Sequence, residues 1–230
     1  MADLNQPLFV SYSNRARRQR TRGDTIMRLH GLFELSRVYS ALIDLSGASA
    51  GRPGFIKNNL NIPPGSRVLE IGCGPGTNIE HMPEGAVYTG CDNNPRYIDF
   101  AVRKYPGRGT FLCLSVDDLP RMNLGEFDVV LVIHVLHHLT DGQVRSAAKG
   151  ALRALRKGGL FLVAEPCWAD RQSRLDRFML SIDRGRHVRT AEGYARLLEE
   201  TFNGGVQSEF IMTPKLLWPQ SGCILRTNKP

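Results

Sequence analysis

The stretch Glu70-Ile71-Gly72-Cys73-Gly74-Pro75-Gly76 decides the fold expected for this chain. It follows a short apolar run, Arg67–Ile71, which predicts a buried strand, and it precedes a short predicted helix, Thr77–Met82. Glycines at alternate positions remove the Cβ atoms that would keep a ligand away from the backbone. Ligands of open α/β sheets bind beyond the carboxyl ends of the strands, so this turn marks an expected binding site.

An acidic residue, Asp92, follows Gly72 by 20 positions and comes directly after a second predicted strand, Ala86–Cys91. A carboxylate at this place can accept hydrogen bonds from both hydroxyl groups of a ribose. Dinucleotide-binding turns favour the spacing G-x-G-x-x-G, in which a pyrophosphate sits on a helix N-terminus. Thr77 stands where that pattern has its last glycine. Glu70 would repel a pyrophosphate, and it suits a cationic cofactor that carries an amino group.

The rest of the chain alternates apolar runs with helical stretches, which predicts a mostly parallel sheet with helices on both faces. Further strands are expected over Thr110–Leu114, Phe127–Ile133 and Leu160–Glu165, the last of them after a turn at Lys157-Gly158-Gly159. Further helices are expected over Pro95–Lys104, Gly142–Leu155 and Thr190–Thr201. Two final apolar runs, Val206–Met212 and Gly222–Arg226, predict an antiparallel hairpin that completes a seven-stranded sheet.

The glycine turn with its following acid resembles motif I of the class I S-adenosylmethionine-dependent methyltransferases. Two later stretches are similar to further motifs of that family: Phe127-Asp128-Val129-Val130, which runs into Val135-Leu136-His137-His138-Leu139, and Leu155–Leu160. The resemblance spans roughly residues 65–165. It implies a Rossmann-like class I methyltransferase fold, S-adenosylmethionine as methyl donor, S-adenosylhomocysteine as product, and no metal ion.

The resemblance also implies roles for individual residues. The glycine turn would line the methionine part of the cofactor, Asp92 would hold the ribose, and Asn93 and the segment Ser115–Asp117 would lie at the adenine. The implied cofactor-binding residues are Glu70, Gly72, Cys73, Gly74, Gly76, Asn78, Asp92, Asn93, Ser115, Val116, Asp117, Ile133 and His134. Ser115 departs from the family, whose members commonly carry an acid there, and a neutral hydrogen bond is about half as strong as a charged one.

Three histidines after the fourth predicted strand are the candidates for acid–base chemistry. Methyl transfer from a sulfonium needs the acceptor placed in line with water excluded, and a hydroxyl acceptor also benefits from a base. Histidine titrates near neutral pH, so His134, His137 and His138 are the nearest candidates. His134 and His138 are the predicted catalytic residues, and His134 is expected to contact the acceptor. Packing of the loop is the alternative role of the pair His137-His138.

The additions to the sheet are expected to set acceptor specificity. They are an N-terminal helical segment (24–60) and a lid connection, Pro166–Arg189, in which arginines lie beside aromatic residues. Tyr39, Trp168 and His187 are the predicted substrate-wall residues. Base N-methyltransferases carry an Asn/Asp-Pro-Pro-Tyr-like motif after the fourth strand, and this sequence has none there. The paired-glutamate loop of protein arginine methyltransferases is missing from the sequence as well. A small-molecule acceptor, methylated on oxygen, nitrogen or carbon, is therefore expected.

Composition favours one globular domain, expected over residues 24–230, with 42% hydrophobic and 23% charged residues. No apolar run reaches the roughly 18 residues of a membrane span, and no secretory signal is recognisable, so a cytoplasmic location is expected. The five cysteines form no CxxC pair, which argues against zinc and against a disulfide framework. The composition is compatible with a homodimer as well as a monomer.

The net charge of +8 includes six arginines between Asn14 and Arg28. They predict a basic, disordered arm over residues 1–23, which can also bind phosphate-bearing partners by charge. Two alternative functions therefore stay open. One is methylation of RNA or ribosomal protein with the help of this arm, and the other is a non-catalytic S-adenosylmethionine-binding partner protein, for which Ser115 is the support.

Overall fold

The computed structural model describes residues 56–170, 172–182, 185–203, 205–213 and 220–230. The chain divides into two units, Met1–Arg37 and Val38–Pro230, and every described residue belongs to the second. The predicted basic arm (1–23), most of the helical segment (24–60) and Tyr39 lie outside the described residues. Of that segment the structure describes its last turn, the helical turn η1 (Ile56–Leu60).

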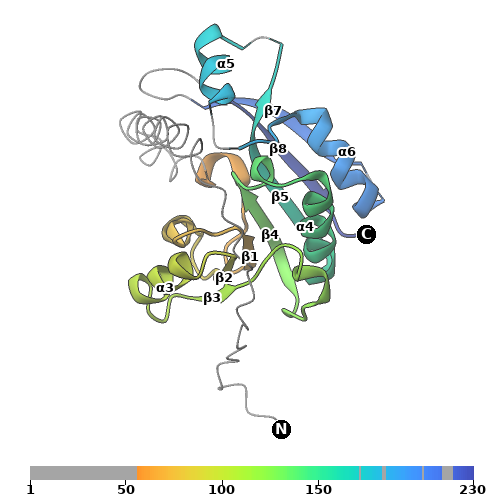
Figure 1. The fold of residues 1–230 in the computed structure, drawn as a ribbon. Coiled ribbons are helices and arrows are strands. Elements are labelled where there is room, and N and C mark those ends of the chain that lie inside the picture. The colour runs from red at the N-terminus through yellow and green to blue at the C-terminus, as the bar shows by residue number, and fades with distance from the viewer. Residues whose placement is uncertain (1–55, 171, 183–184, 204, 214–219) are drawn as a thin grey trace, which may run out of the picture. The chain divides into compact units, whose positions relative to one another are not determined.

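Seven strands of the described chain lie side by side in the order β3-β2-β1-β4-β5-β8-β7 (Figure 1). They are β1 (Arg67–Ile71), β2 (Val87–Asp92), β3 (Gly109–Cys113), β4 (Phe127–Ile133), β5 (Leu155–Trp168), β7 (Gln207–Thr213) and β8 (Gln220–Asn228). The first five run parallel, and β8 is antiparallel to both β5 and β7. The predicted mostly parallel sheet with its C-terminal antiparallel hairpin is confirmed. Sequence reasoning missed β6 (Arg189–Thr190), which pairs with the end of β5.

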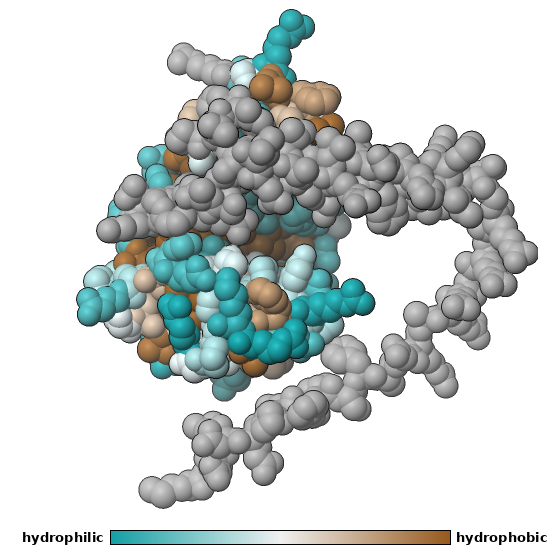
Figure 2. Space-filling view, turned by 90° about the vertical axis from the view of Figure 1, so that its left-hand side faces the viewer, coloured by the Kyte–Doolittle hydropathy of each residue, from teal (hydrophilic) through white to brown (hydrophobic). Residues whose placement is uncertain are grey.

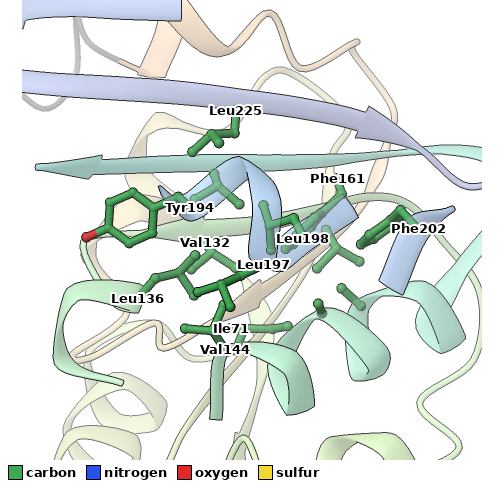
Figure 3. Packing of buried hydrophobic residues seen from close by; sticks show 14 of the residues in the cluster. Ile71, Val132, Leu136, Val144, Phe161, Tyr194, Leu197, Leu198, Phe202 and Leu225 are labelled. Atoms are coloured by element: carbon green, nitrogen blue, oxygen red, sulfur yellow. The ribbon is translucent and has the colours of Figure 1, made fainter. Parts of the chain in front are cut away.

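Helices cover both faces of the sheet, as predicted. On one face α4 (Asp141–Ala154) and α6 (Ala191–Phe202) pack against alternate residues of the central strands, among them Leu69, Val130 and Phe161. Figure 3 shows this layer, in which side chains from α6 meet those of β4, β5 and β8. On the other face η1 packs on Val68, Val129 and Leu131. The helix α3 (Pro95–Lys104) contacts β2 and β3.

Local signals explain where the helices begin. The side chain of Asn94 accepts a hydrogen bond from the Arg96 N–H (3.1 Å), and Pro95 supplies the first helical residue of α3. Thr140 and Gln143 form a capping box at α4, since each side chain binds the backbone N–H of the other. The side chain of Thr190 caps α6 by accepting from the Gly193 N–H (3.1 Å).

Two elements differ from their predictions. The strand β5 is longer than Leu160–Glu165, because the predicted turn at Lys157-Gly158-Gly159 is an irregularity within it, with Gly158 in the left-handed region (φ 71°). The segment after the glycine turn, η2 (Thr77–His81), is a tight 3₁₀ turn of five residues. It is therefore too short to present the N-terminus of a full α-helix to a ligand.

The connection after β5 carries a short helix, α5 (Arg174–Ser181), inside the predicted lid Pro166–Arg189. Two more 3₁₀ turns, η3 (Leu119–Arg121) and η4 (Leu136–His138), precede and follow β4. None of the helices in the described ranges is both long and apolar enough to cross a membrane. Hydrophobic and hydrophilic residues are interspersed on the face seen in Figure 2, and α3 exposes Tyr97 and Phe100.

Candidate active site

The glycine turn connects β1 to η2 through three residues with left-handed backbone conformations. Gly72, Gly74 and Gly76 have φ angles of 75°, 53° and 75°, which side chains with a Cβ adopt only at a cost. The N–H groups of Gly72 and Cys73 donate to the Cys91 carbonyl at the end of β2 (2.7 and 2.9 Å). Glycine is thus required here by backbone conformation, and the turn is bound to the neighbouring strand.

The three glycines face different surroundings. A Cβ on Gly72 would collide with the side chain of Val135, and one on Gly76 would collide with the Phe111 ring. A Cβ on Gly74 would meet no atom within 4 Å. The turn therefore packs tightly at both ends and opens at its middle, where a ligand can approach the backbone.

A buried carboxylate, that of Glu70, lies beneath the turn. Its side chain is fully buried, and its oxygens accept hydrogen bonds from the Asn78 amide (2.6 Å) and the Tyr88 hydroxyl (2.5 Å). Burial, reinforced by the charge of Glu70, raises the pKa of Tyr88 well above its usual range, so the phenol remains a donor. Burial and the same charge also raise the pKa of Cys73. Glu70 and Asn78 thus support the turn, and the Glu70 carboxylate places negative charge below it.

Asp92 ends β2 beside the open part of the turn. Its Oδ2 accepts the Gly74 N–H (2.9 Å), and its Oδ1 accepts the Asn94 N–H (2.8 Å). A carboxylate oxygen has two acceptor positions, so each oxygen of Asp92 keeps one for a further donor. The half-buried Asp92 and the exposed Asn93 stand together at this edge of the sheet.

The predicted adenine segment follows the neighbouring strand, β3. The Leu114 N–H donates to the Asp92 carbonyl (3.0 Å), which keeps this segment next to Asp92. The Ser115 hydroxyl accepts the Asp117 N–H (3.3 Å) in a short local turn, while Val116 packs against the main core. The structure thus brings Ser115 and Asp92 to the same edge of the sheet.

These residues fit a cationic nucleoside cofactor such as S-adenosylmethionine. Gly74 leaves room over the backbone, Asp92 has acceptor positions for a ribose, and two carboxylates supply negative charge. They fit a pyrophosphate poorly, since η2 offers no α-helix N-terminus and Glu70 would repel the anion. No group of three or more His, Cys, Asp or Glu residues that could hold a metal ion occurs within the described ranges.

The loop after β4, residues 134–139, begins at the same edge of the sheet. Ile133 ends β4 half-buried, and the exposed His134 follows with a positive φ of 56°. A non-glycine residue in this conformation is strained and persists only where its surroundings hold it. The His134 N–H donates to the Ala164 carbonyl of β5 (2.9 Å). Val135 then packs on Gly72, so the 134–139 loop and the glycine turn touch.

A buried acid–histidine pair lies beneath this loop. Glu165, in β5, accepts hydrogen bonds from the N–H groups of Val135 (2.7 Å) and Leu136 (2.8 Å), and its Oε2 lies 2.6 Å from His137 Nδ1. Burial by itself would raise the pKa of Glu165, but the hydrogen bond and charge of His137, together with His134 and the Leu136 N–H, hold it below its usual value. His137 is therefore engaged in structure, while the exposed His138 ring packs against it, with 4.0 Å between ring centroids.

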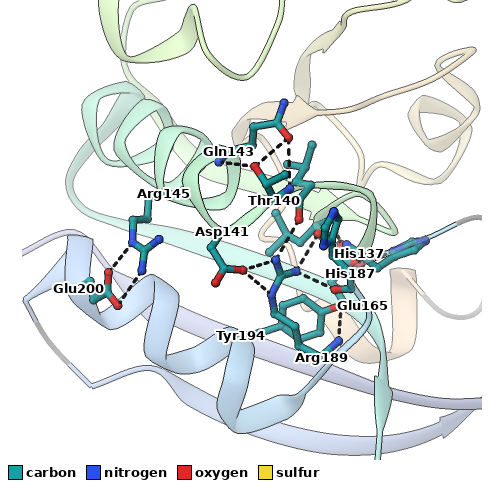
Figure 4. Close-up of polar contacts among 12 residues, drawn as sticks. His137, Thr140, Asp141, Gln143, Arg145, Glu165, His187, Arg189, Tyr194 and Glu200 are labelled. Carbon is teal, nitrogen blue, oxygen red and sulfur yellow. Dashed lines mark hydrogen bonds and ion pairs between the residues drawn. The ribbon is translucent and has the colours of Figure 1, made fainter.

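The lid connection returns alongside the same loop (Figure 4). The His187 N–H donates to the His137 carbonyl (2.9 Å), and the Trp168 indole donates to the Val188 carbonyl (3.1 Å). The Arg189 guanidinium donates to the carbonyls of Leu136 (3.1 Å), Leu139 (2.9 Å) and His187 (2.8 Å), and it pairs with Asp141 (2.5 Å). The predicted wall residue His187 thus contacts the 134–139 loop through its backbone, and Trp168 binds the residue that follows His187.

The described residues form an open α/β sheet, and the residues at the carboxyl ends of its strands fit a nucleoside cofactor. A family model described as a methyltransferase domain matches residues 68–159. An uncharacterized methyltransferase of Synechocystis sp. is 34% identical over 108 residues, which cover 46% of this chain and 50% of that protein. A ubiquinone biosynthesis O-methyltransferase of Idiomarina loihiensis is 32% identical over 112 residues, covering 47% of this chain and 45% of the relative. The chain thus spans about half the length of these curated relatives.

Among solved structures, the N-methyltransferase NodS from Bradyrhizobium japonicum, in complex with S-adenosyl-L-homocysteine, superimposes with a TM-score of 0.55. Its sequence is 21% identical, and the match covers 85% of this chain and 87% of that one. At this identity the likeness concerns the fold. Residues 68–159 therefore match a methyltransferase domain, and the fold of the described residues is the Rossmann-like fold of methyltransferases such as NodS.

Sequence reasoning missed two residues of this site, Glu165 and Arg189. Glu165 had one local signal: it is an acid at the end of an otherwise apolar run, much as Glu70 is an acid within the apolar run of its own strand. Arg189 was one of several arginines in the lid, and nothing in its immediate sequence distinguishes it from the others. The contacts that Glu165 and Arg189 make with the 134–139 loop join segments that are distant in the chain.

Proposed function

We propose that this chain transfers a methyl group from S-adenosylmethionine to a small-molecule acceptor whose reacting atom lies beside His134. The observation that supports this most is the packing of Val135 on Gly72, because it puts the donor turn one residue away from His134. The similarity to a ubiquinone biosynthesis O-methyltransferase favours a hydroxyl group as the methylated function.

The residues of the chain act by binding and positioning. S-adenosylmethionine, when bound, supplies a methyl group that its sulfonium centre already activates. Asp92 would accept the ribose hydroxyls at the acceptor positions that the Gly74 and Asn94 N–H groups leave. Glu70 would favour the cation from beneath the turn, and the open side of Gly74 would let the ligand approach the backbone. Ser115 and Asn93 are the proposed adenine contacts.

His134 is the proposed base for a hydroxyl acceptor. Its exposed side chain stands at the carboxyl end of β4, and it would take the hydroxyl proton as the acceptor oxygen forms its bond to the methyl group. His137 is unsuited because it is buried against Glu165. His138 remains the second proposed base, and Trp168 and His187 remain the proposed walls of the acceptor site.

Calorimetry and a transfer assay test the proposal separately for donor and acceptor. The purified chain should bind S-adenosylmethionine and S-adenosylhomocysteine and should not bind NAD. With methyl-tritiated S-adenosylmethionine, it should label catechol or hydroquinone, and His134→Ala should reduce that labelling. Binding of NAD without S-adenosylmethionine would refute the donor, and labelling of RNA in place of both phenols, lost on deletion of residues 1–22, would refute the small-molecule acceptor.

A further inference from the structure

The 134–139 loop has an unusual set of partners. It lies outside the sheet ladder, yet each of its six backbone N–H groups has an acceptor. His134 donates to Ala164, and the N–H groups of His138 and Leu139 donate within the loop. The three N–H groups between them all donate to the single carboxylate of Glu165. One buried side chain therefore holds half of the donors of this loop.

The carbonyl groups of the loop have partners in the segment that precedes α6. Arg189 donates to the carbonyls of Leu136 and Leu139, and the His187 N–H donates to the carbonyl of His137. The guanidinium is itself fixed, since it also pairs with Asp141 and lies over the Tyr194 ring, 5.4 Å from its centroid. A planar guanidinium with several donors can make these contacts together, which a lysine cannot.

These contacts begin directly after His134, the one residue of the loop with a positive φ. His134 has a positive φ and precedes Val135, the first residue that Glu165 holds. Because Val135 also packs on Gly72, a shift of the loop would move His134 relative to the donor turn. An error of about 1 Å in such a placement can cost roughly 100-fold in rate.

We propose that Glu165 and Arg189 are positioning residues, which bind the N–H and carbonyl groups of the 134–139 loop and so aim His134 at the methyl acceptor. This inference rests on the proposed function. It assigns neither residue to contact with the donor or the acceptor. The two residues act through the backbone of the loop, and the pair His137–Glu165 adds a side-chain contact to the same anchor.

Two conservative variants test the inference. Glu165→Gln keeps the shape of the side chain and removes the charge, and Arg189→Lys keeps the charge and removes the planar donors. Asp128→Asn is the matched control for Glu165→Gln, because the Asp128 carboxylate likewise accepts from a backbone N–H and from a basic side chain, that of Arg156. Asp128 lies at the opposite end of β4 from the 134–139 loop. Arg145→Lys is the control for the second, because Arg145 binds Glu200 through two nitrogens at the surface.

The first measurement is amide hydrogen exchange of residues 134–139, followed by NMR, which requires no acceptor. Exchange at Val135 and Leu136 should rise roughly 10- to 100-fold in Glu165→Gln, as expected for loss of a charge-assisted hydrogen bond, and should stay unchanged in Asp128→Asn. Unchanged exchange in the Glu165 and Arg189 variants would overturn the inference. The melting temperature of each variant, compared with that of its control, shows whether the fold is retained.

The second measurement is transfer to catechol with tritiated S-adenosylmethionine. Both variants should lose roughly 100-fold in kcat while their affinity for S-adenosylmethionine changes far less. If exchange rises and kcat does not fall, the loop is held but the positioning role is wrong. If the wild-type chain labels no probe, the proposed function fails, whereas the exchange data still decide whether these residues hold the loop.

Discussion

The carboxylate of Glu70 allows its structural and its electrostatic contributions to be separated. Glu70→Ala would leave the Asn78 amide and the Tyr88 hydroxyl without their acceptor, at sites that are 8% and 2% exposed. An unsatisfied buried donor costs about 1–3 kcal/mol, so the two together cost about 4 kcal/mol of unfolding free energy. For a domain of this size, that corresponds to a fall in melting temperature of roughly 8–16 °C.

Glu70→Gln should behave differently, because its amide can satisfy both neighbours. The Gln oxygen can accept from Asn78, and the Gln NH2 can donate to the Tyr88 oxygen, so the loss should be about 1 kcal/mol. Removal of the charge should still weaken binding of the cationic donor about tenfold. Thermal unfolding and calorimetry with S-adenosylmethionine measure both effects, with the exposed Glu84→Ala as control. Equal destabilisation by Glu70→Gln and Glu70→Ala would refute the hydrogen-bonding argument.

Three further predictions concern other residues. Asp92→Ala should weaken S-adenosylmethionine binding about 10- to 100-fold in calorimetry, while Asp99→Ala on the exposed side of α3 should not. Glu165 has a lowered pKa in the folded protein, so its ionised form stabilises the fold above about pH 4.5. This stabilisation is lost as the pH falls through the lower pKa of the folded state. Urea unfolding between pH 7 and 3 should therefore show a shallower acid decline for Glu165→Gln, and an equally steep decline would contradict this. His134→Gly should be about 1 kcal/mol more stable to urea than His134→Ala, because glycine adopts the positive φ without strain; equal stability would argue against strain at this position.

The sequence alone predicted the features that depend on neighbouring residues. The glycine turn, the parallel strands and the C-terminal hairpin follow from local apolar periodicity and from turn residues, which act over a few positions. The bounds of α3 were predicted to the residue, because Asn94 and Pro95 are local start signals. The end of β5 was predicted too early, since Pro166 pairs with β8 and the last two residues, Cys167 and Trp168, pair with β6. The strand β6 was missed because two residues carry no periodicity.

Only the tertiary structure decided what each charged and histidine side chain does. His137 and Glu165 are 28 residues apart, and Arg189 and Leu136 are 53 apart, so no local pattern connects them. The parallel pairing of β4 with β5 brings the carboxyl ends of these strands together and buries Glu165 under the loop that follows β4. Burial then makes every unpaired polar group costly, which commits Glu165 to the loop and His137 to Glu165. The sequence could thus name three histidines after the fourth strand, and the folded sheet distinguished the buried one from the two exposed ones.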